Sequence, residues 1–217
     1  MFKVGGKTTQ ILYRKPIIYF YDPFALGFGC RLLWGCSTEH LVEFYNDNIS
    51  SNHLDIGVGT GYFLDKCDFP STNPRLALMD LNSTCLVIAA RRLARYKPEV
   101  YQENILETIH ITAPQFDSIG MLNLLHCLPG DMVSKGIAFE HIKGMLNSDG
   151  IVFGSTILGK DLRHNLFTSL ALAISNAIGT MSNMKDDLEG LQNSLRKHFS
   201  ESHVHLIGNE AIFWAKL

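Results

Sequence analysis

Positive charge is too scarce in this sequence for a typical nucleic-acid-binding protein. The chain has 19 lysines and arginines against 21 aspartates and glutamates, so its formal net charge is −2. A protein that binds a phosphate backbone normally carries a basic surface. The composition therefore predicts that nucleic acid is not a partner.

Cysteine pairs of the kind that hold zinc are also missing. The number of cysteines is odd, and no two of them are separated by only two residues. This loose spacing argues against both a zinc site and a disulfide framework. Free thiols are typical of a reducing compartment, so we expect a cytoplasmic protein without a metal site. The cysteines are Cys30, Cys36, Cys67, Cys85 and Cys127.

Long apolar runs are absent as well. The longest apolar helix candidate, residues 166–178, is interrupted by polar residues and is shorter than the roughly 20 residues that cross a bilayer. Residues 16–30 are apolar and aromatic, but Asp22 and Pro23 break the run, so they do not read as a signal peptide. We expect no membrane partner.

What the sequence does contain is an alternation of short apolar strands and helical segments. This alternation is typical of an α/β doubly wound sheet, and 217 residues suit a single domain with a sizeable core. Ser83 is a candidate cap for one of the helices. We expect strands near 53–58, 75–80, 98–103, 116–122 and 149–156, and helices near 61–66, 83–95, 131–146, 161–178 and 185–198.

The two ends of the chain depart from this alternation. Residues 203–207 and 211–215 are rich in strand-forming residues, and Gly208-Asn209 lies between them, which predicts a hairpin. Residues 1–50 precede the first expected strand. We expect them to form a helical lid over the site, and residues 51–217 to form the core.

Three alternating glycines are the most informative feature. Gly57, Gly59 and Gly61 follow an apolar strand and precede a helix, and a glycine lets the backbone pass close to a ligand. A strand, a glycine turn and a helix together form a nucleotide-type site at the carboxyl end of a parallel sheet. Asp55 at the end of the strand would repel a pyrophosphate. It suits a ligand that carries positive charge.

The segment Leu54–Gly61 (LDIGVGTG) resembles the first motif of the class I S-adenosylmethionine-dependent methyltransferases. Segments 76–80, 116–130 and 150–154 resemble that family's second strand, fourth strand with its active-site loop, and fifth strand, in family order. The resemblance covers roughly residues 50–217. It implies a Rossmann-like sheet of seven strands whose C-terminal hairpin is antiparallel.

The resemblance also implies which residues bind S-adenosylmethionine. Asp80 would hold the ribose hydroxyls, although it could instead be a helix cap. Asn104 would meet the adenine, although it could be a loop asparagine. The implied cofactor-binding residues are Asp55, Gly57, Gly59, Gly61, Asp80, Leu81, Asn104, Ile105, Met121 and Leu122.

His126 is the candidate catalytic residue. It follows the fourth expected strand, where the family transfers its methyl group, and a neutral histidine can accept a proton near working pH. The alternative is a structural histidine. Tyr13, Tyr21 and Trp34 belong to an aromatic N-terminal segment and are candidate contacts for the methyl acceptor.

The sequence therefore predicts a methyltransferase that acts on O, N or S of a small, hydrophobic or aromatic metabolite, as a monomer or homodimer. The segment Asn123–His126 lacks the Asn-Pro-Pro-Tyr type loop of enzymes that methylate nucleic acid bases or proteins. Two alternatives remain. One is a nicotinamide-dependent oxidoreductase, which Asp80 would suit and Asp55 would not. The other is a protein that binds the cofactor without transferring a methyl group.

Overall fold

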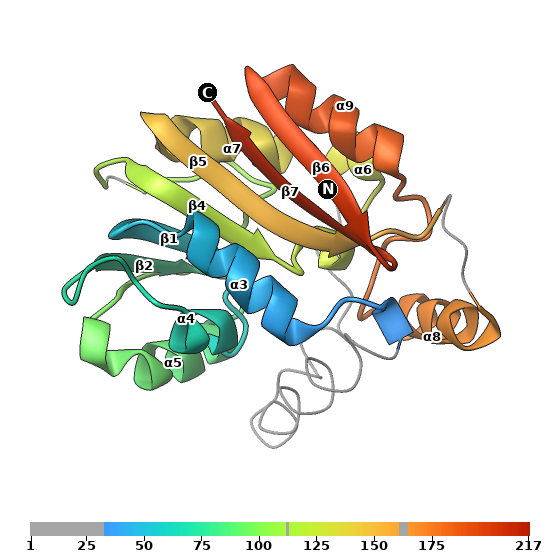
Figure 1. Cartoon of the computed structure of the whole chain (residues 1–217), viewed down its shortest axis with the longest axis horizontal. Helices are drawn as coiled ribbons and strands as arrows, with labels where there is room; N and C mark the ends of the chain where they lie inside the picture. Colours follow the sequence, from blue (N-terminus) through green and yellow to red (C-terminus); the bar gives the residue numbers. More distant parts are fainter. Residues whose placement is uncertain (1–32, 112, 161–164) are drawn as a thin grey trace.

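The computed structural model describes residues 33–111, 113–160 and 165–217. These residues form a seven-stranded sheet in the order β3-β2-β1-β4-β5-β7-β6 (Figure 1). The strands are β1 (Asn52–Ile56), β2 (Arg75–Met79), β3 (Glu99–Tyr101), β4 (Phe116–Leu122), β5 (Leu146–Ile157), β6 (Glu201–Ile207) and β7 (Glu210–Lys216).

The directions of the strands confirm the predicted fold class. Strand β1 pairs in parallel with β2 and β4, and β2–β3 and β4–β5 are also parallel. Strand β7 runs antiparallel to both β5 and β6, as the predicted C-terminal hairpin requires. The strand order reverses between β1 and β4, and ligands of open α/β sheets bind in the crevice at such a point.

The helices follow the predicted segments, with two corrections. The helix predicted over 131–146 is broken at Gly136, which packs close to Ser194 and would bring a Cβ within 3.2 Å of its Oγ. The cap of α5 is Asn82, whose side chain accepts from Thr84 N, and not Ser83. The helices are α3 (Thr38–Asn48), α4 (Tyr62–Lys66), α5 (Ser83–Arg92), α6 (Met132–Lys135), α7 (Ile137–Met145), α8 (Leu166–Ala177) and α9 (Leu188–His198), with 3₁₀ turns η2 (Ala94–Tyr96) and η3 (Leu125–Cys127).

Helices α3, α4 and α5 cover one face of the sheet. Leu41 and Tyr45 of α3 are fully buried against Phe153 of β5, together with Leu64 of α4 and Leu86 of α5. Figure 1 shows α3 crossing in front of the strands. The described part of the predicted N-terminal lid therefore packs on the sheet face, where each buried large apolar side chain contributes about 1.5–3 kcal/mol.

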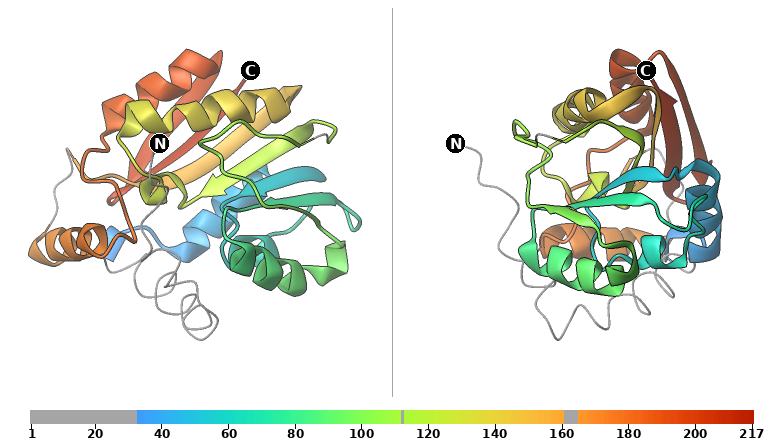
Figure 2. Two further views of the ribbon diagram at one scale, coloured as in Figure 1. Left: turned by 180° about the vertical axis from the view of Figure 1, so that it is seen from behind. Right: turned by 90° about the vertical axis from the view of Figure 1, so that its left-hand side faces the viewer.

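Helices α6, α7 and α9 cover the opposite face. Met132 of α6, Phe139 and Ile142 of α7 and Leu195 of α9 pack against Phe213 of β7. Figure 2 shows α7 in front of the strands when the molecule is viewed from behind. The two cores pack on opposite faces of the sheet and leave the loops at the carboxyl ends of its strands free to form a site.

A third, smaller cluster lies at the carboxyl end of β5. Trp34, Ile157 and Leu172 are buried together there, and Leu172 belongs to α8. Among the described residues, no helix is long and apolar enough to cross a membrane.

Candidate cofactor and active site

The glycine turn after β1 takes a backbone conformation that side chains rarely adopt. Gly57, Gly59 and Gly61 have φ values of +73°, +54° and +75°. A non-glycine residue in this left-handed region costs roughly 1–2 kcal/mol. The turn therefore ends β1 at Ile56, two residues earlier than the sequence predicted, and starts α4 at Tyr62.

The three glycines differ in what surrounds them. A Cβ on Gly57 would lie 2.6 Å from Leu124 Cδ1, and one on Gly61 would lie 3.2 Å from the Ala89 Cα of α5. These two glycines allow close packing within the protein. A Cβ on Gly59 would meet only the Gly57 carbonyl oxygen, at 4.0 Å. The space over Gly59 is thus the part of the turn that is left open for a ligand.

A cleft lies over this turn at the carboxyl ends of β1 and β4. Predicted residues that line it are Asp55, Gly57, Gly59, Gly61 and Leu122. The remaining lining residues were not predicted from the sequence. They are Val58, Thr60, Tyr62, Phe63, Leu64 and Asn123. Most of these flank the glycines directly, so their position in the motif could have identified them.

A buried chain of polar groups fixes Asp55. The Tyr45 hydroxyl of α3 donates to Asp55 Oδ2 and lies 2.7 Å from His53 Nε2. The Nδ1 atom of His53 in turn lies 2.7 Å from the Ser118 hydroxyl. Burial, reinforced by the Asp55 charge, raises the pKa of Tyr45 well above its usual value, so Tyr45 keeps its proton. Asp55 is therefore held as an oriented hydrogen-bond acceptor at the wall of the cleft.

Asp80 connects the glycine turn to the start of α5. Its carboxylate accepts hydrogen bonds from Gly59 N at 3.3 Å and from Asn82 N at 2.8 Å. The alternative role of Asp80 as a helix cap is filled by Asn82, two residues further along the chain. Burial raises the pKa of Asp80 to about 6, and the two backbone donors only partly oppose this.

The other predicted cofactor residues, Leu81, Asn104, Ile105 and Met121, do not line the cleft. The Asn104 side chain accepts from Leu106 N and donates to Glu107 Oε1, so it holds its own turn. Ile105 and Met121 are buried, and Leu81 is largely exposed. Their contacts with a cofactor stay predictions.

His126 is buried and already holds a hydrogen bond. Its Nδ1 accepts from Ile157 N at 3.2 Å, and burial together with the Lys135 charge lowers its pKa to about 3. A neutral imidazole whose Nδ1 accepts carries its hydrogen on Nε2, so it has no free lone pair for a substrate proton. These contacts favour the structural alternative for His126.

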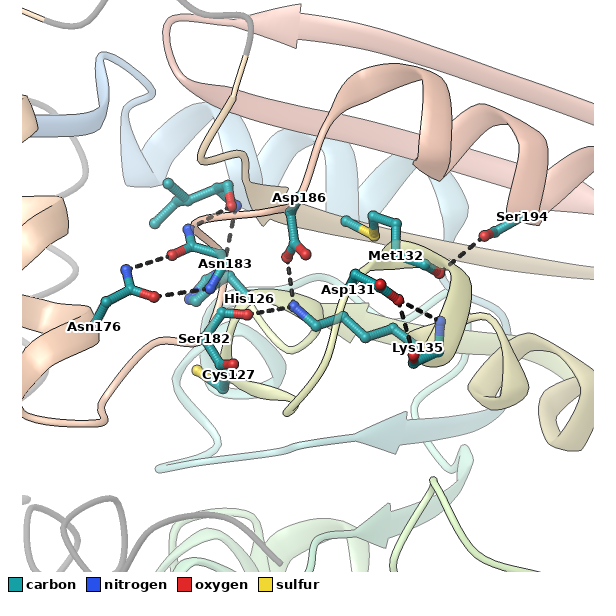
Figure 3. A network of polar contacts seen from close by, with 12 residues as sticks. His126, Cys127, Asp131, Met132, Lys135, Asn176, Ser182, Asn183, Asp186 and Ser194 are labelled. Atoms are coloured by element: carbon teal, nitrogen blue, oxygen red, sulfur yellow. Dashed lines mark hydrogen bonds and ion pairs between the residues drawn. The ribbon is translucent and has the colours of Figure 1, made fainter. Parts of the chain in front are cut away.

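Figure 3 shows the network that surrounds His126. The Lys135 ammonium donates to Ser182 O at 2.8 Å and to Asp186 Oδ2 at 2.5 Å, and both side chains of this ion pair are fully buried. Asn183 donates to Ile157 O at 2.8 Å. Ser182 N also donates to His126 O at 2.7 Å. These bonds connect the chain before α9 to α6, to the loop after β4 and to the end of β5.

The predicted acceptor contacts are only partly visible. Tyr13 and Tyr21 lie outside the described residues. Trp34 is 6% exposed and packs against Ile157 at the end of β5, and its carbonyl oxygen accepts from Asn209 N at 2.7 Å. It does not line the cleft over the glycine turn, so its contact with an acceptor stays a prediction.

Comparison with known proteins decides the family. A family model described as a methyltransferase domain matches residues 54–152. The chain is 39% identical over 206 residues to the Physcion biosynthesis cluster O-methyltransferase of Aspergillus chevalieri, covering 94% of this chain and 92% of that one. The chain belongs to the methyltransferase family. It is also 34% identical to the demethylluteothin O-methyltransferase of Streptomyces thioluteus, covering 88% of this chain and 83% of the relative.

Solved structures confirm the fold of this methyltransferase. The DhpI complex with S-adenosylhomocysteine matches with a TM-score of 0.65 at 14% identity, covering 97% of this chain and 95% of that one. The N-methyltransferase NodS from Bradyrhizobium japonicum WM9, also with S-adenosylhomocysteine, matches with a TM-score of 0.64 at 17% identity, covering 96% and 97%. This chain is an S-adenosylmethionine-dependent methyltransferase, as predicted.

The residues of the cleft fit the cofactor of this methyltransferase. The open space over Gly59 admits a ligand against the backbone, and Asp55 offers a carboxylate to a positively charged group. The Asp80 carboxylate accepts a hydrogen bond from Gly59 N of the turn. An acidic group at this place can accept hydrogen bonds from ribose hydroxyls. The site therefore suits S-adenosylmethionine better than a dinucleotide, whose pyrophosphate the Asp55 charge would repel.

The affinity of the methyltransferase for S-adenosylhomocysteine should fall in acid. A carboxylate accepts hydrogen bonds from hydroxyls and a protonated carboxyl accepts them less well, so affinity should drop as pH falls through the raised pKa of Asp80, about 6. Between pH 7.5 and pH 5 we expect a loss of about tenfold. The stability of the free protein should respond in the opposite sense, since a raised carboxyl pKa favours the folded state on protonation.

Calorimetric titration of the parent and of Asp80→Asn at both pH values tests this. The variant should bind about 1.5–3 kcal/mol more weakly at pH 7.5 and should lose the acid dependence. Equal acid dependence in parent and variant would show that another group is responsible.

Proposed function

We propose that this methyltransferase methylates a hydroxyl oxygen of a small, largely apolar metabolite. The observation that carries the proposal is the 39% identity, over nearly the whole chain, to a protein named as an O-methyltransferase of a biosynthesis cluster. A second relative, 34% identical, is named for O-methylation of demethylluteothin. The net charge of −2 is consistent with an acceptor that is not a nucleic acid.

The surroundings of the site support an apolar acceptor. Leu122 lines the cleft, and Leu124 lies against Gly57 in the loop after β4. The cluster of Trp34, Ile157 and Leu172 lies at the carboxyl end of β5, the strand next to β4. Small-molecule sites are mostly apolar with a few directed polar groups, and this edge of the sheet has that composition.

We propose the following roles for the cofactor-binding residues. Asp55, oriented by Tyr45, faces the positively charged methionine portion, and Asp80 accepts from the ribose. The backbone near Met121 and Leu122 borders the methionine portion, and the segment of Leu81, Asn104 and Ile105 borders the adenine. When bound, the cofactor supplies an electrophilic methyl group on a sulfonium. The protein's own contribution is to hold the acceptor oxygen in line with that methyl group and to exclude water.

Incubation with S-adenosylmethionine and two matched libraries tests the proposal. One library contains hydroxylated aromatic compounds, and in the other an amine replaces the hydroxyl. We expect a methyl ether and S-adenosylhomocysteine in equal amounts from the first library, detected by mass spectrometry. Products from the amines alone would overturn O-methylation. They would instead align the protein with the relative vrtF of Penicillium aethiopicum, a 33% identical protein named as an N-methyltransferase.

The remaining predictions concern the cellular location and the oligomeric state of the protein. The absence of paired cysteines supports a cytoplasmic location. We propose a monomer or homodimer as the assembly. We also propose that the part of residues 1–50 that precedes α3 forms a lid over the site, since α3 itself packs on the sheet face.

A further inference from the structure

Glu210 is a buried acid whose carboxylate makes no hydrogen bond of normal geometry with the described residues. It is the first residue of β7 and is fully buried, and only the Ser155 hydroxyl and the Cys36 thiol lie close enough to affect its pKa as donors. Burying a polar group without a hydrogen bond costs free energy, and burying a charge costs more. A buried carboxylate without such bonds in a native structure calls for an explanation, and a catalytic role or a bound ligand is one.

The position of Glu210 places it at the acceptor end of the site. It is opposite Ile157, the last residue of β5, in the antiparallel pairing of β5 with β7. Strand β5 neighbours β4, whose carboxyl end borders the cofactor cleft. Glu210 therefore lies at the same edge of the sheet as the cleft, displaced from the glycine turn toward the end of β5.

A short line of polar groups connects Glu210 with the cleft. The Ser155 hydroxyl lies close enough to lower the pKa of Glu210, although it makes no hydrogen bond of normal geometry to it. Ser155 Oγ accepts from Asn123 N at 3.2 Å and lies 3.4 Å from Asn123 Oδ1. Asn123 lines the cleft and has a φ of +56°, rare for a non-glycine residue. Strained backbone of this kind clusters at functional sites.

The segment before α3 closes the space over Glu210. Asn209 N donates to Trp34 O, and a Cβ on Gly208 would lie 2.3 Å from that same oxygen. Both Gly35 and Gly208 have positive φ values, of +74° and +59°. Only residues without a Cβ allow this close approach of the segment to the hairpin turn. The cover is formed by residues 34–36, the stretch of the chain directly before α3.

We propose that Glu210 is the residue that binds the acceptor hydroxyl and takes its proton. This inference rests on the proposed O-methylation. As the acceptor oxygen bonds to the methyl carbon, its O–H bond breaks and the proton passes to Glu210, while the bond from that carbon to sulfur breaks. The products are the methyl ether, S-adenosylhomocysteine and protonated Glu210, which then returns its proton to water. The acceptor reaches Glu210 when segment 34–36 moves aside, as active-site lids do.

The ionisation of Glu210 suits this role. Burial raises its pKa to about 7, and the nearby Ser155 hydroxyl and Cys36 thiol offset this only in part. The imidazole of His205 lies on the same face of the hairpin, and burial lowers the pKa of His205, which favours its neutral form. A general base works best when its pKa lies near the operating pH. His126, by contrast, has its lone pair engaged by Ile157 N.

Glu210→Gln tests the proposal, because glutamine keeps the shape of the side chain and cannot take the proton. With the hydroxylated aromatic that the parent methylates fastest, kcat should fall about 100- to 10,000-fold. Affinity for S-adenosylhomocysteine should stay unchanged. The kcat of the parent should rise with pH through about 7 and that of the variant should not. Glu201→Gln, at an exposed position of the same hairpin, should match the parent.

Several outcomes separate this inference from the function on which it rests. If the parent forms no methyl ether, the proposed function fails. If the parent forms the ether and a folded Glu210→Gln protein keeps the parental kcat, only the role of Glu210 is overturned. A pH profile in Glu210→Gln that still rises like that of the parent would also overturn it and would assign the base to another residue. Weaker acceptor binding to the variant loaded with S-adenosylhomocysteine, measured by calorimetry, would support the direct contact.

Discussion

Gly59→Val is expected to remove measurable binding of S-adenosylhomocysteine from a protein that remains folded. The Cβ of a residue at this position points into open space, where the ligand would lie against the backbone. A valine side chain fills that space, and the φ of +54° adds strain to the turn. We expect affinity to fall at least about 100-fold, equivalent to about 2.8 kcal/mol. Isothermal titration of a variant with native circular dichroism is the measurement.

Two further variants separate occlusion from strain. Gly59→Ala carries the same unfavourable φ with a smaller side chain, so its affinity should lie between those of the parent and Gly59→Val. Gly144→Val is the surface control, since a Cβ there meets nothing within 4 Å, and it should bind like the parent. Undiminished affinity in folded Gly59→Val would mean that the cofactor does not lie over this turn.

Asp186→Ala should destabilise the protein by about 3–5 kcal/mol, because it leaves the Lys135 ammonium buried without its counter-charge. Burial lowers the pKa of Lys135 and raises that of Asp186, while each partner opposes the effect on the other. The change would also remove one of the contacts that link the chain before α9 to α6. Urea unfolding measures the loss.

Two further variants give reference values for the loss of stability in Asp186→Ala. Lys135→Met with Asp186→Leu removes both charges together, so it should recover most of the lost stability. Asp65→Ala breaks the Asp65–Arg95 pair, which is partly exposed, and should cost less than about 1 kcal/mol. A loss in Asp186→Ala no larger than that of Asp65→Ala would show that the buried pair contributes little.

The fold could be predicted because its signals are local. The glycine turn and the Gly-Asn hairpin each show within one short stretch of sequence, the alternation of strands and helices shows as neighbouring local patterns along the chain, and the observed sheet follows them. Where a predicted helix is broken in the structure, the cause is a contact between segments that are far apart in the sequence. The helix expected over 131–146 is broken where Gly136 packs against Ser194 of α9, a contact between residues far apart in the chain.

The polar networks could not be predicted, because they depend on which side chains meet across the folded sheet. Tyr45 reaches Asp55 from a helix on the sheet face, and Lys135 meets Asp186 from 51 residues away. Glu210 carries no motif at all. Its significance follows only from its burial and its place opposite the end of β5.

For His126, the sequence predicted the position of the residue in the fold but not its chemistry. His126 lies in the loop after β4, as predicted, and a histidine at this position could act as a base. The backbone N–H of Ile157, 31 residues further on, occupies the nitrogen that a base would need. The chemistry of a titratable residue depends on these partners, and sequence spacing does not reveal them.

Titration of the parent protein with S-adenosylhomocysteine and, separately, with NADH tests the central assignment most directly. The glycine turn, the Tyr45-oriented Asp55 and the Asp80 carboxylate together predict saturable binding of S-adenosylhomocysteine and none of NADH. At about 100 times Kd, the ligand should also raise the free energy of unfolding by about 2.7 kcal/mol. Binding of NADH without any binding of S-adenosylhomocysteine would contradict the assignment.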